Sequence, residues 1–504
     1  MGPAEQFGPQ GKWRGEVWMT PGEAPTQGAQ FSAKAQAGGG VALVLGAGNQ
    51  SFLTVIDVLH CLFLHSECVL CKHHPLRGYQ EPAFQAIFAP FIERGFMATV
   101  ADGGREMTAA LTEHALVKHI HVTGGKGTHD AIMWGPVEGR AQRMHANDSD
   151  LLKAGKTLTS ELGAVTPWVV CPAAVSEAEL AHQASHLTAA LIANNSCNCN
   201  APKLVLLADG WKQKQQFVDL VKGNLRSLPA GVPYYPGTRQ RYEEIERIYA
   251  ECSERVVHFR VFVGEGAAHA SHHSHSRRKR RRDRRGGHLV PVRGAAHVSG
   301  RRAAGRALGA RAAGGALRTR GDLRVGGAGP DAGHSNRAAL LECAAGIVND
   351  TVFGTLSCTL ILHPTTQAAL PEACERLIAR LQYGTIVVNA WTALAYPIDT
   401  AAWGGFQPTE DPRAIESGNG FVQNTLLFDH LQKCVVYVPL VNKAQLLHES
   451  APPLDDPKNI TNVVEFLLHP GLGTFCGILP LKEKASIAVF WVAVAAALMY
   501  AFAS

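Results

Sequence analysis

Two residues, Cys199 and Glu161, have the chemistry and the spacing for covalent catalysis on a carbonyl group. Cys199 lies in the polar stretch Asn194–Asn200, shortly before the apolar run Leu204–Leu207. Glu161 precedes Cys199 by 38 residues. A cysteine thiolate can attack a carbonyl carbon, and a nearby carboxylate can later activate water against the resulting thioester. Because an isolated cysteine is more often a small buried hydrophobic residue, the prediction depends on the surrounding loop and on Glu161.

The segments around both residues resemble characteristic boxes of the aldehyde dehydrogenase superfamily. Ser160–Gly163 resembles its Glu-Leu-Gly box, and Asn194–Cys199 resembles its Asn-x-Gly-x-x-Cys box. The resemblance covers about residues 40–262 and 342–440 and continues in three downstream boxes, at Val348–Gly354, Gly384–Asn389 and Trp403–Phe406. It implies that Cys199 is the nucleophile and that Glu161 is the general base for thioester hydrolysis.

The same resemblance implies an oxyanion hole and a nucleotide site. Asn49 takes the position of an asparagine whose side-chain amide joins the backbone N–H of Cys199 in holding the oxyanion. Lys72 takes the position of a lysine that contacts the adenosine ribose, and Gly124 and Gly125 begin a turn at which glycine lets the backbone approach the pyrophosphate. The implied cofactor is NAD or NADP.

The order of apolar runs predicts an α/β protein with parallel sheets. Strands are expected at residues 41–45, 68–71, 97–100 and 119–123, and in a second region at 168–170, 204–207, 358–362 and 385–389. Helical spacing of apolar residues falls between several of these runs, as at 52–64 and 84–94. Strands and helices that alternate in this way indicate parallel sheets in an α/β layer architecture, with ligands at the carboxyl ends of the strands. The resemblance implies that the two regions are a Rossmann-type cofactor domain and an α/β catalytic domain.

Composition and the resemblance together divide the chain of 504 residues into six regions, one of which is in two pieces. We expect a disordered lead-in at 1–39, a truncated cofactor domain at 40–162, a catalytic domain at 163–262 and 339–450, a disordered basic insertion at 263–338, a linker at 451–484 and an apolar tail at 485–504. The insertion lacks aromatic residues and so cannot build a core. A gene-model artefact is an alternative explanation of it.

The basic insertion dominates the charge of the chain. Residues 277–337 hold 17 Lys and Arg against three Asp, so the rest of the chain is at −8 although the total is +6. Nucleic-acid binding through this block is disfavoured, because no aromatic side chain is interleaved for base stacking. The twelve scattered cysteines fit a reducing compartment rather than a disulfide framework. No metal site is expected, since Cys68 and Cys71 have no second ligand pair and alternate on a predicted strand.

The last 20 residues contain no charged side chain. A helix over 485–504 would be about 30 Å long, enough to cross a bilayer once. Lys482 and Lys484 precede it and favour a cytosolic body. The prediction is a single-pass C-terminal membrane anchor, and the alternative is a buried C-terminal helix.

Together these features predict NAD(P)-dependent oxidation of a hydrophobic aldehyde to a carboxylic acid, in a possible homo-oligomer. The family's Glu-x-Phe-Gly-Pro box, expected between residues 263 and 340, has no match in the sequence. Two alternatives therefore stay open: a catalytically inactive membrane-bound scaffold of the same fold, and an acyl-CoA reductase, which would not need Glu161 for hydrolysis.

Overall fold

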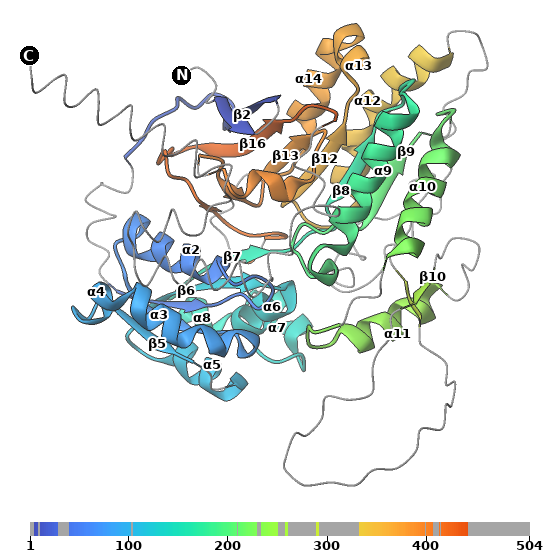
Figure 1. The fold of residues 1–504 in the computed structure, drawn as a ribbon. Coiled ribbons are helices and arrows are strands. Elements are labelled where there is room, and N and C mark those ends of the chain that lie inside the picture. The colour runs from blue at the N-terminus through green and yellow to red at the C-terminus, as the bar shows by residue number, and fades with distance from the viewer. Residues whose placement is uncertain are drawn as a thin grey trace, which may run out of the picture.

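The computed structural model describes most of the chain between the N-terminal strands and residue 441. The described residues are 5–8, 11–28, 40–101, 104–208, 210–228, 233–249, 258–260, 289–291, 332–398, 400–406, 413 and 415–441. Two sheets, each covered by helices, form the molecule (Figure 1).

The first sheet has five parallel strands in the order β5-β4-β3-β6-β7. Their bounds are β3 Val41–Leu45, β4 Cys68–Lys72, β5 Met97–Val100, β6 Val117–Gly124 and β7 Thr157–Leu162. The helices between them are α2 Leu53–Leu59, η2 His60–Leu64, η3 Pro75–Gln80, α3 Glu81–Ile87, α4 Ala89–Ile92, α5 Gly104–Glu113, α6 Lys126–Trp134, α7 Arg140–Ala146 and α8 Asp150–Lys153. β3, the first strand of this sheet along the chain, lies in the middle of the sheet. The strand order therefore reverses between β3 and β6, and ligands of such sheets bind at this point.

Both faces of the five-stranded sheet are buried. Val58 of α2 and Phe84 of α3 pack on one face, and Met133 and Trp134 of α6 pack on the other. The strands are accordingly rich in buried apolar residues, as expected for a parallel sheet between helices. Buried polar side chains also occur on these strands, mainly on β6 and β7, among them His119, His121 and Glu161.

The second sheet has seven strands in the order β1-β2-β16-β13-β12-β8-β9. Their bounds are β1 Glu5–Gly8, β2 Gly11–Met19, β8 Pro167–Val170, β9 Leu204–Leu207, β12 Ser357–Ile361, β13 Thr385–Val388 and β16 Leu431–Tyr437. The strands from β16 to β9 are parallel, whereas β2 pairs antiparallel with β16 and β1 antiparallel with β2. Two further antiparallel pairs are small: β10 His258–Arg260 with β11 Leu289–Pro291, and β14 Trp403–Gly404 with β15 Phe421–Val422.

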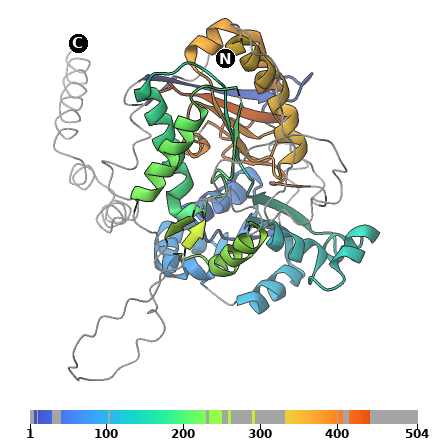
Figure 2. The same ribbon diagram turned by 90° about the vertical axis from the view of Figure 1, so that its right-hand side faces the viewer.

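Helices cover both faces of the seven-stranded sheet as well (Figure 2). Helices α9 Glu177–Ile192 and α10 Lys214–Ser227 pack on one face, and α12 Ala332–Thr351 and α14 Pro371–Arg380 on the other. The remaining helical segments are η4 Ala193–Ser196, α11 Thr238–Tyr249, α13 Pro364–Ala369 and η6 Thr392–Ala395. The expectation of an α/β architecture with parallel sheets is confirmed.

The disordered lead-in expected for residues 1–39 is wrong for residues 11–19. These residues form β2, which pairs with β16 from Arg14 opposite Tyr437 to Met19 opposite Leu431. The seven-stranded sheet and its helices form the second domain. The side chains of Trp13 and Trp18 pack on the hydrophobic cores of this domain, and this tertiary burial outweighs the weak local pattern.

The predicted membrane tail, the linker and most of the predicted basic insertion lie outside the described residues. Within the range expected for the insertion, the structure describes β11 and the first residues of α12, which begins at Ala332. Among the described residues, no helix combines the length and the hydrophobicity needed to cross a bilayer.

Candidate active site

Helix α9 carries the chain to the loop that holds Cys199. A capping box starts the helix: Ser176 Oγ accepts from the Glu179 backbone N–H at 3.3 Å, and Glu179 Oε2 accepts from the Ser176 N–H at 2.8 Å. The apolar side of α9, including Leu187 and Leu191, is buried against Trp168 of β8. The loop therefore leaves from a helix fixed on the sheet.

The loop begins with three consecutive residues in the left-handed region. Asn194, Asn195 and Ser196 have φ values of 52°, 50° and 61°. Asparagine adopts this conformation more readily than most residues, whereas serine pays a larger cost. Ser196 takes the position of the glycine in the Asn-x-Gly-x-x-Cys box, so the loop adopts a left-handed backbone there although the glycine is missing.

Asn49 lies against this loop. Its carbonyl oxygen accepts from Asn194 Nδ2 at 2.8 Å, and the neighbouring Gln50 Nε2 donates to Asn198 Oδ1 at 2.7 Å. Tyr234 adds a hydroxyl that donates to Asn194 Oδ1 at 2.7 Å. The structure thus brings Asn49 to the loop that holds Cys199, through contacts of its carbonyl. Its predicted side-chain role in an oxyanion hole stays a prediction.

Glu161 is held on β7 by residues of the second domain. A short segment around Gly418 runs antiparallel along the outer edge of β7, and the Leu162 N–H donates to the Ser417 carbonyl at 2.7 Å. Asn419 completes the contact, because its Oδ1 accepts from the Ser160 N–H at 2.8 Å. The Glu161 side chain points into the buried contact between β7 and the segments that carry Trp403 and Gly418, which we call the seam. There its Oε1 accepts from Trp403 Nε1 at 2.8 Å.

Cys199 and Glu161 come together at this seam. The Cys199 carbonyl accepts from the Ala164 N–H at 3.1 Å, which ties the loop that holds Cys199 to the residues just after β7. A Cβ added to Gly163 would lie 3.6 Å from the Cys199 Cα. The absence of a side chain at this position lets the two backbones approach closely.

Burial controls the charge of both groups. Burial first, and then the negative charge of Asp57, raise the pKa of the Glu161 carboxyl to about 8, and the hydrogen bond from Trp403 opposes the rise. Burial, followed by the charge of Glu161, raises the pKa of the Cys199 thiol to about 12. Both groups are therefore mainly neutral near pH 7.

Asp57 and Tyr396 complete the buried cluster, and the sequence had not singled them out. Within the described part of the chain, Glu161 Oε2, both Asp57 carboxylate oxygens and the Tyr396 hydroxyl are buried without a hydrogen-bond partner, although His121 Nε2 approaches Asp57 Oδ1 to 3.3 Å. Burial first, and then the charges of Glu161, Asp57 and Cys199, raise the pKa of the Tyr396 hydroxyl. Unsatisfied buried polar groups are rare and concentrate at functional sites, so this cluster is the strongest candidate for chemistry.

The predicted nucleotide residues lie at the carboxyl edge of the five-stranded sheet. Gly124 ends β6, and Gly125 is the N-cap of α6, where an added Cβ would meet no atom within 4 Å. The first turn of α6 contains no acidic side chain, so its N–H groups suit a phosphate. Lys72 ends β4 and is 5% exposed, and its Nζ donates to the His73 carbonyl at 3.4 Å. These residues fit a dinucleotide at the phosphate position, while Lys72 is more enclosed than a ribose contact requires.

The downstream boxes form the scaffold behind the seam. Gly384 and Gly404 come so close that a Cβ on Gly384 would lie 2.0 Å from the Gly404 carbonyl oxygen. The Asn389 side chain pairs with the backbone of Leu362, accepting at 2.8 Å and donating at 3.0 Å, which links the ends of β12 and β13. Asn389 therefore makes a strand-end contact with the backbone.

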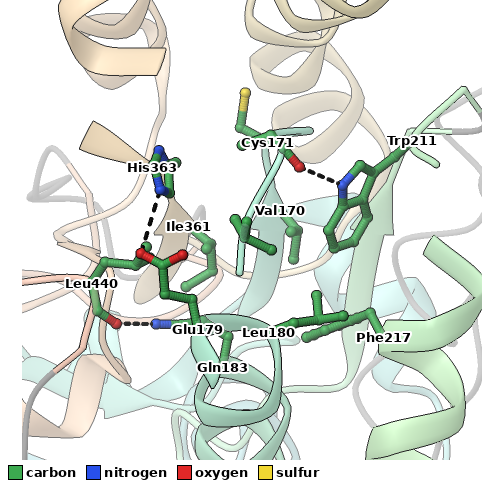
Figure 3. Close-up of a pocket in the computed structure, with 12 residues that line it drawn as sticks. Val170, Cys171, Glu179, Leu180, Gln183, Trp211, Phe217, Ile361, His363 and Leu440 are labelled. Carbon is green, nitrogen blue, oxygen red and sulfur yellow. Dashed lines mark hydrogen bonds and ion pairs between the residues drawn. The ribbon is translucent and has the colours of Figure 1, made fainter. Parts of the chain in front are cut away.

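A small pocket lies away from this cluster, at the carboxyl ends of β8 and β12 (Figure 3). Its walls are mostly apolar, with Trp211 and Phe217 on one side, and the polar pair Glu179–His363 at 3.5 Å on another. The chemistry of the molecule therefore points to the Cys199–Glu161 seam rather than to this pocket.

Comparison with known proteins gives a family match for part of the chain. Residues 38–241 match the family described as the aldehyde dehydrogenase family. No curated protein sequence matches the chain.

Several solved structures are similar at low identity. A proline utilization A variant from Bradyrhizobium japonicum is 16% identical, with a TM-score of 0.48, and the match covers 83% of this chain and 35% of that protein. A Mycobacterium tuberculosis aldehyde dehydrogenase complexed with NAD+ is 15% identical, with a TM-score of 0.48, and the match covers 88% of this chain and 73% of that protein. HpcC from Thermus thermophilus is 15% identical, with a TM-score of 0.49, and the match covers 87% of this chain and 70% of that protein. This chain thus spans about a third of the proline utilization A structure.

Proposed function

We propose, from the match of residues 38–241 to the aldehyde dehydrogenase family, that the chain is a member of this superfamily and oxidises an aldehyde to a carboxylic acid with NAD or NADP. One observation carries the proposal: the Cys199 thiol lies at a buried seam whose other polar groups, Glu161, Asp57 and Tyr396, have oxygens without hydrogen-bond partners. A nucleophile, a base and unpaired oxygens in one enclosed place are what thioester chemistry needs.

The first step is the attack of Cys199 on the aldehyde. Its sulfur forms a bond to the carbonyl carbon, and the thiol proton passes to the Glu161 carboxylate. The oxygen that becomes negative is held by the Cys199 backbone N–H and the Asn49 amide. Gly124 and Gly125, at the start of α6, would hold the dinucleotide at its phosphates. A bound dinucleotide would supply the hydride acceptor, and Cys199 would keep the acyl group as a thioester.

The second step releases the acid. After its proton has passed to solvent, Glu161 takes a proton from water, the water oxygen bonds to the acyl carbon, and the carbon–sulfur bond breaks. The raised pKa of Glu161 suits this task, because a base works best when its pKa lies near the working pH. Glu161 also favours hydrolysis over transfer to a thiol, which argues against acyl-CoA reduction.

The substrate and the membrane tail form a further part of the proposal. We infer from the uncharged run 485–504 that the body is anchored at a membrane on its cytosolic side and that its substrate is a hydrophobic aldehyde that partitions into the bilayer. Membrane fractionation of cells expressing the full chain and a chain ending at residue 484 tests the anchor. Recovery of both chains in the soluble fraction would refute it.

The activity is tested by absorbance of the reduced cofactor, with the full chain, a medium-chain aldehyde and NAD or NADP. We expect turnover that Cys199→Ala abolishes and that Cys197→Ala, a matched change of the neighbouring thiol, largely preserves. The missing Glu-x-Phe-Gly-Pro box and the neutral Cys199 thiol support the inactive scaffold as the second candidate. Absence of turnover with either cofactor, together with no acylation of Cys199 by an activated ester, would establish that second candidate.

A further inference from the structure

A second cluster of reactive side chains lies at the opposite edge of the five-stranded sheet, near the amino ends of its strands. Cys61 is in η2, Glu67 directly precedes β4, and His119 is the third residue of β6. One ligand atom from each, the Cys61 Sγ, a Glu67 carboxylate oxygen and a His119 ring nitrogen, lies within 4.8 Å of the other two. No step of the proposed oxidation uses any of these groups.

His119 has a polar partner at each ring nitrogen, and one of them, Thr159 Oγ1, also lies 2.8 Å from His121 Nδ1. The His119 Nδ1 lies 2.8 Å from Glu67 Oε2, and its Nε2 lies 2.6 Å from Thr159 Oγ1. A histidine ligand of a metal ion normally makes a hydrogen bond through its other ring nitrogen, which fixes the tautomer and orients the ring. Thr159 is placed to accept such a bond from Nε2–H, and Nδ1 can then bind an ion beside Glu67.

The local backbone supports the same assignment. Helix α2 continues directly into the π-helical turn η2, which carries Cys61 into the core beneath β3 and β4. Single π-helical turns inside helices are rare and frequent at functional sites. Two further imidazoles flank the cluster: His65 Nε2 lies 3.1 Å from His60 Nε2, and the His65 ring centroid lies 5.5 Å from that of His119. His65 is exposed, so the cluster has a route to solvent.

We propose that Cys61, Glu67 and His119 bind one divalent transition-metal ion of the zinc type, with water or His65 as the fourth ligand. Sulfur, imidazole nitrogen and a single carboxylate oxygen are the ligands of tetrahedral zinc, whereas magnesium and calcium require oxygen ligands. On binding, the Cys61 thiol loses its proton to solvent and the sulfur–metal bond forms. The site would fasten η2 to β6, and it differs from the Cys68–Cys71 pair that the sequence offered.

The test uses the full chain, freed of metal with a chelator and titrated with Co2+. Cobalt bound by a thiolate gives a near-ultraviolet charge-transfer absorption, so we expect this band to saturate at one equivalent and to disappear when Zn2+ is added. Cys61→Ala should abolish the band. The matched control is Cys71→Ala, which removes another fully buried thiol of the same domain that is outside the cluster and should leave the band intact.

Two gentler variants protect the test against a failure of Cys61→Ala to fold. Glu67→Gln changes a partly exposed side chain and should keep the band but weaken Co2+ binding at least tenfold. Thr159→Val removes the hydroxyl that orients His119 and should weaken binding about 10- to 100-fold, while Thr159→Ser should restore it. The proposal is overturned by a wild-type protein without the band at excess Co2+, by a band that survives in Cys61→Ala, or by unchanged affinity in Glu67→Gln.

Discussion

The titration of Glu161 gives a quantitative prediction for thioester hydrolysis. A general base acts in its deprotonated form, and burial together with the Asp57 charge raises the pKa of Glu161 to about 8. With that pKa, about one tenth of the carboxyls are ionised at pH 7 and about nine tenths at pH 9. We therefore expect the hydrolysis rate to rise about tenfold between pH 7 and pH 9 and to fall about tenfold further at pH 6.

The assay follows hydrolysis separately from the attack step. Cys199 is first acylated with a chromophoric activated acyl donor, the excess donor is removed, and the loss of thioester absorbance is recorded after a jump to each pH. Glu161→Gln gives the background reaction with hydroxide, which is subtracted. This separation matters because the attack step has a different pH dependence, set by the Cys199 thiol with its pKa of about 12.

Asp57→Asn provides the decisive perturbation. The substitution keeps the shape of the side chain and removes the negative charge that, after burial, contributes most to the raised pKa of Glu161. The midpoint of the pH profile should therefore move to lower pH, and hydrolysis at pH 7 should rise toward its plateau, by at most about tenfold. A wild-type profile that is flat between pH 7 and pH 9, or the same midpoint in Asp57→Asn, would refute this account of the site.

Three further predictions concern the stability of the scaffold. Lys433→Met should lower the melting temperature. The buried Lys433 ammonium donates to the carbonyls of Ile378, Ala379 and Leu381 at 2.8–3.0 Å, and leaving these three carbonyls unpaired costs about 3 kcal/mol or more. An unchanged melting temperature would contradict this prediction. Gly418→Ala should slow thioester hydrolysis and destabilise the protein by about 1–3 kcal/mol, because the new Cβ would lie 2.3 Å from the Ser160 carbonyl oxygen. Gly420→Ala is the control: its new Cβ would meet no atom within 4 Å, so it measures only the cost of a positive φ. Equal effects of the two substitutions would argue against the steric explanation. Ser196→Gly should raise the melting temperature, corresponding to about 0.5–1 kcal/mol, by relieving the left-handed backbone, and a decrease would show that the loop is not strained there.

The parallel cores could be predicted from the sequence because their strands are buried on both faces. The run Leu204–Leu207 is β9 without change, and residues 97–100 are β5. Such runs are nearly continuous in apolar residues, so their position follows from composition alone. The lead-in differed because β2 has little pattern of its own and gains its order from pairing with β16.

The site was only partly predictable for a related reason. Cys199 and Glu161 lie in recognisable boxes, but Asp57 and Tyr396 lie in segments that read as ordinary helix and turn. Their roles depend on tertiary placement: the seam brings together α2, β7 and the residues after β13. Asp57 did carry a signal, since it is a lone charge on the apolar side of a predicted helix, and a buried charge of this kind usually has a function.

The segment 417–419 has a consequence for how the two domains depend on each other. β7 is the last strand of its sheet, and without this segment its outer N–H and C=O groups would be open to any passing extended chain. A fragment ending near residue 162 would expose that open border next to the glutamate and would tend to associate with its own copies. The second domain thus protects the edge strand of the first from association with other chains. Docking of the two domains is needed both to prevent this association and to hold Glu161 in position as a base.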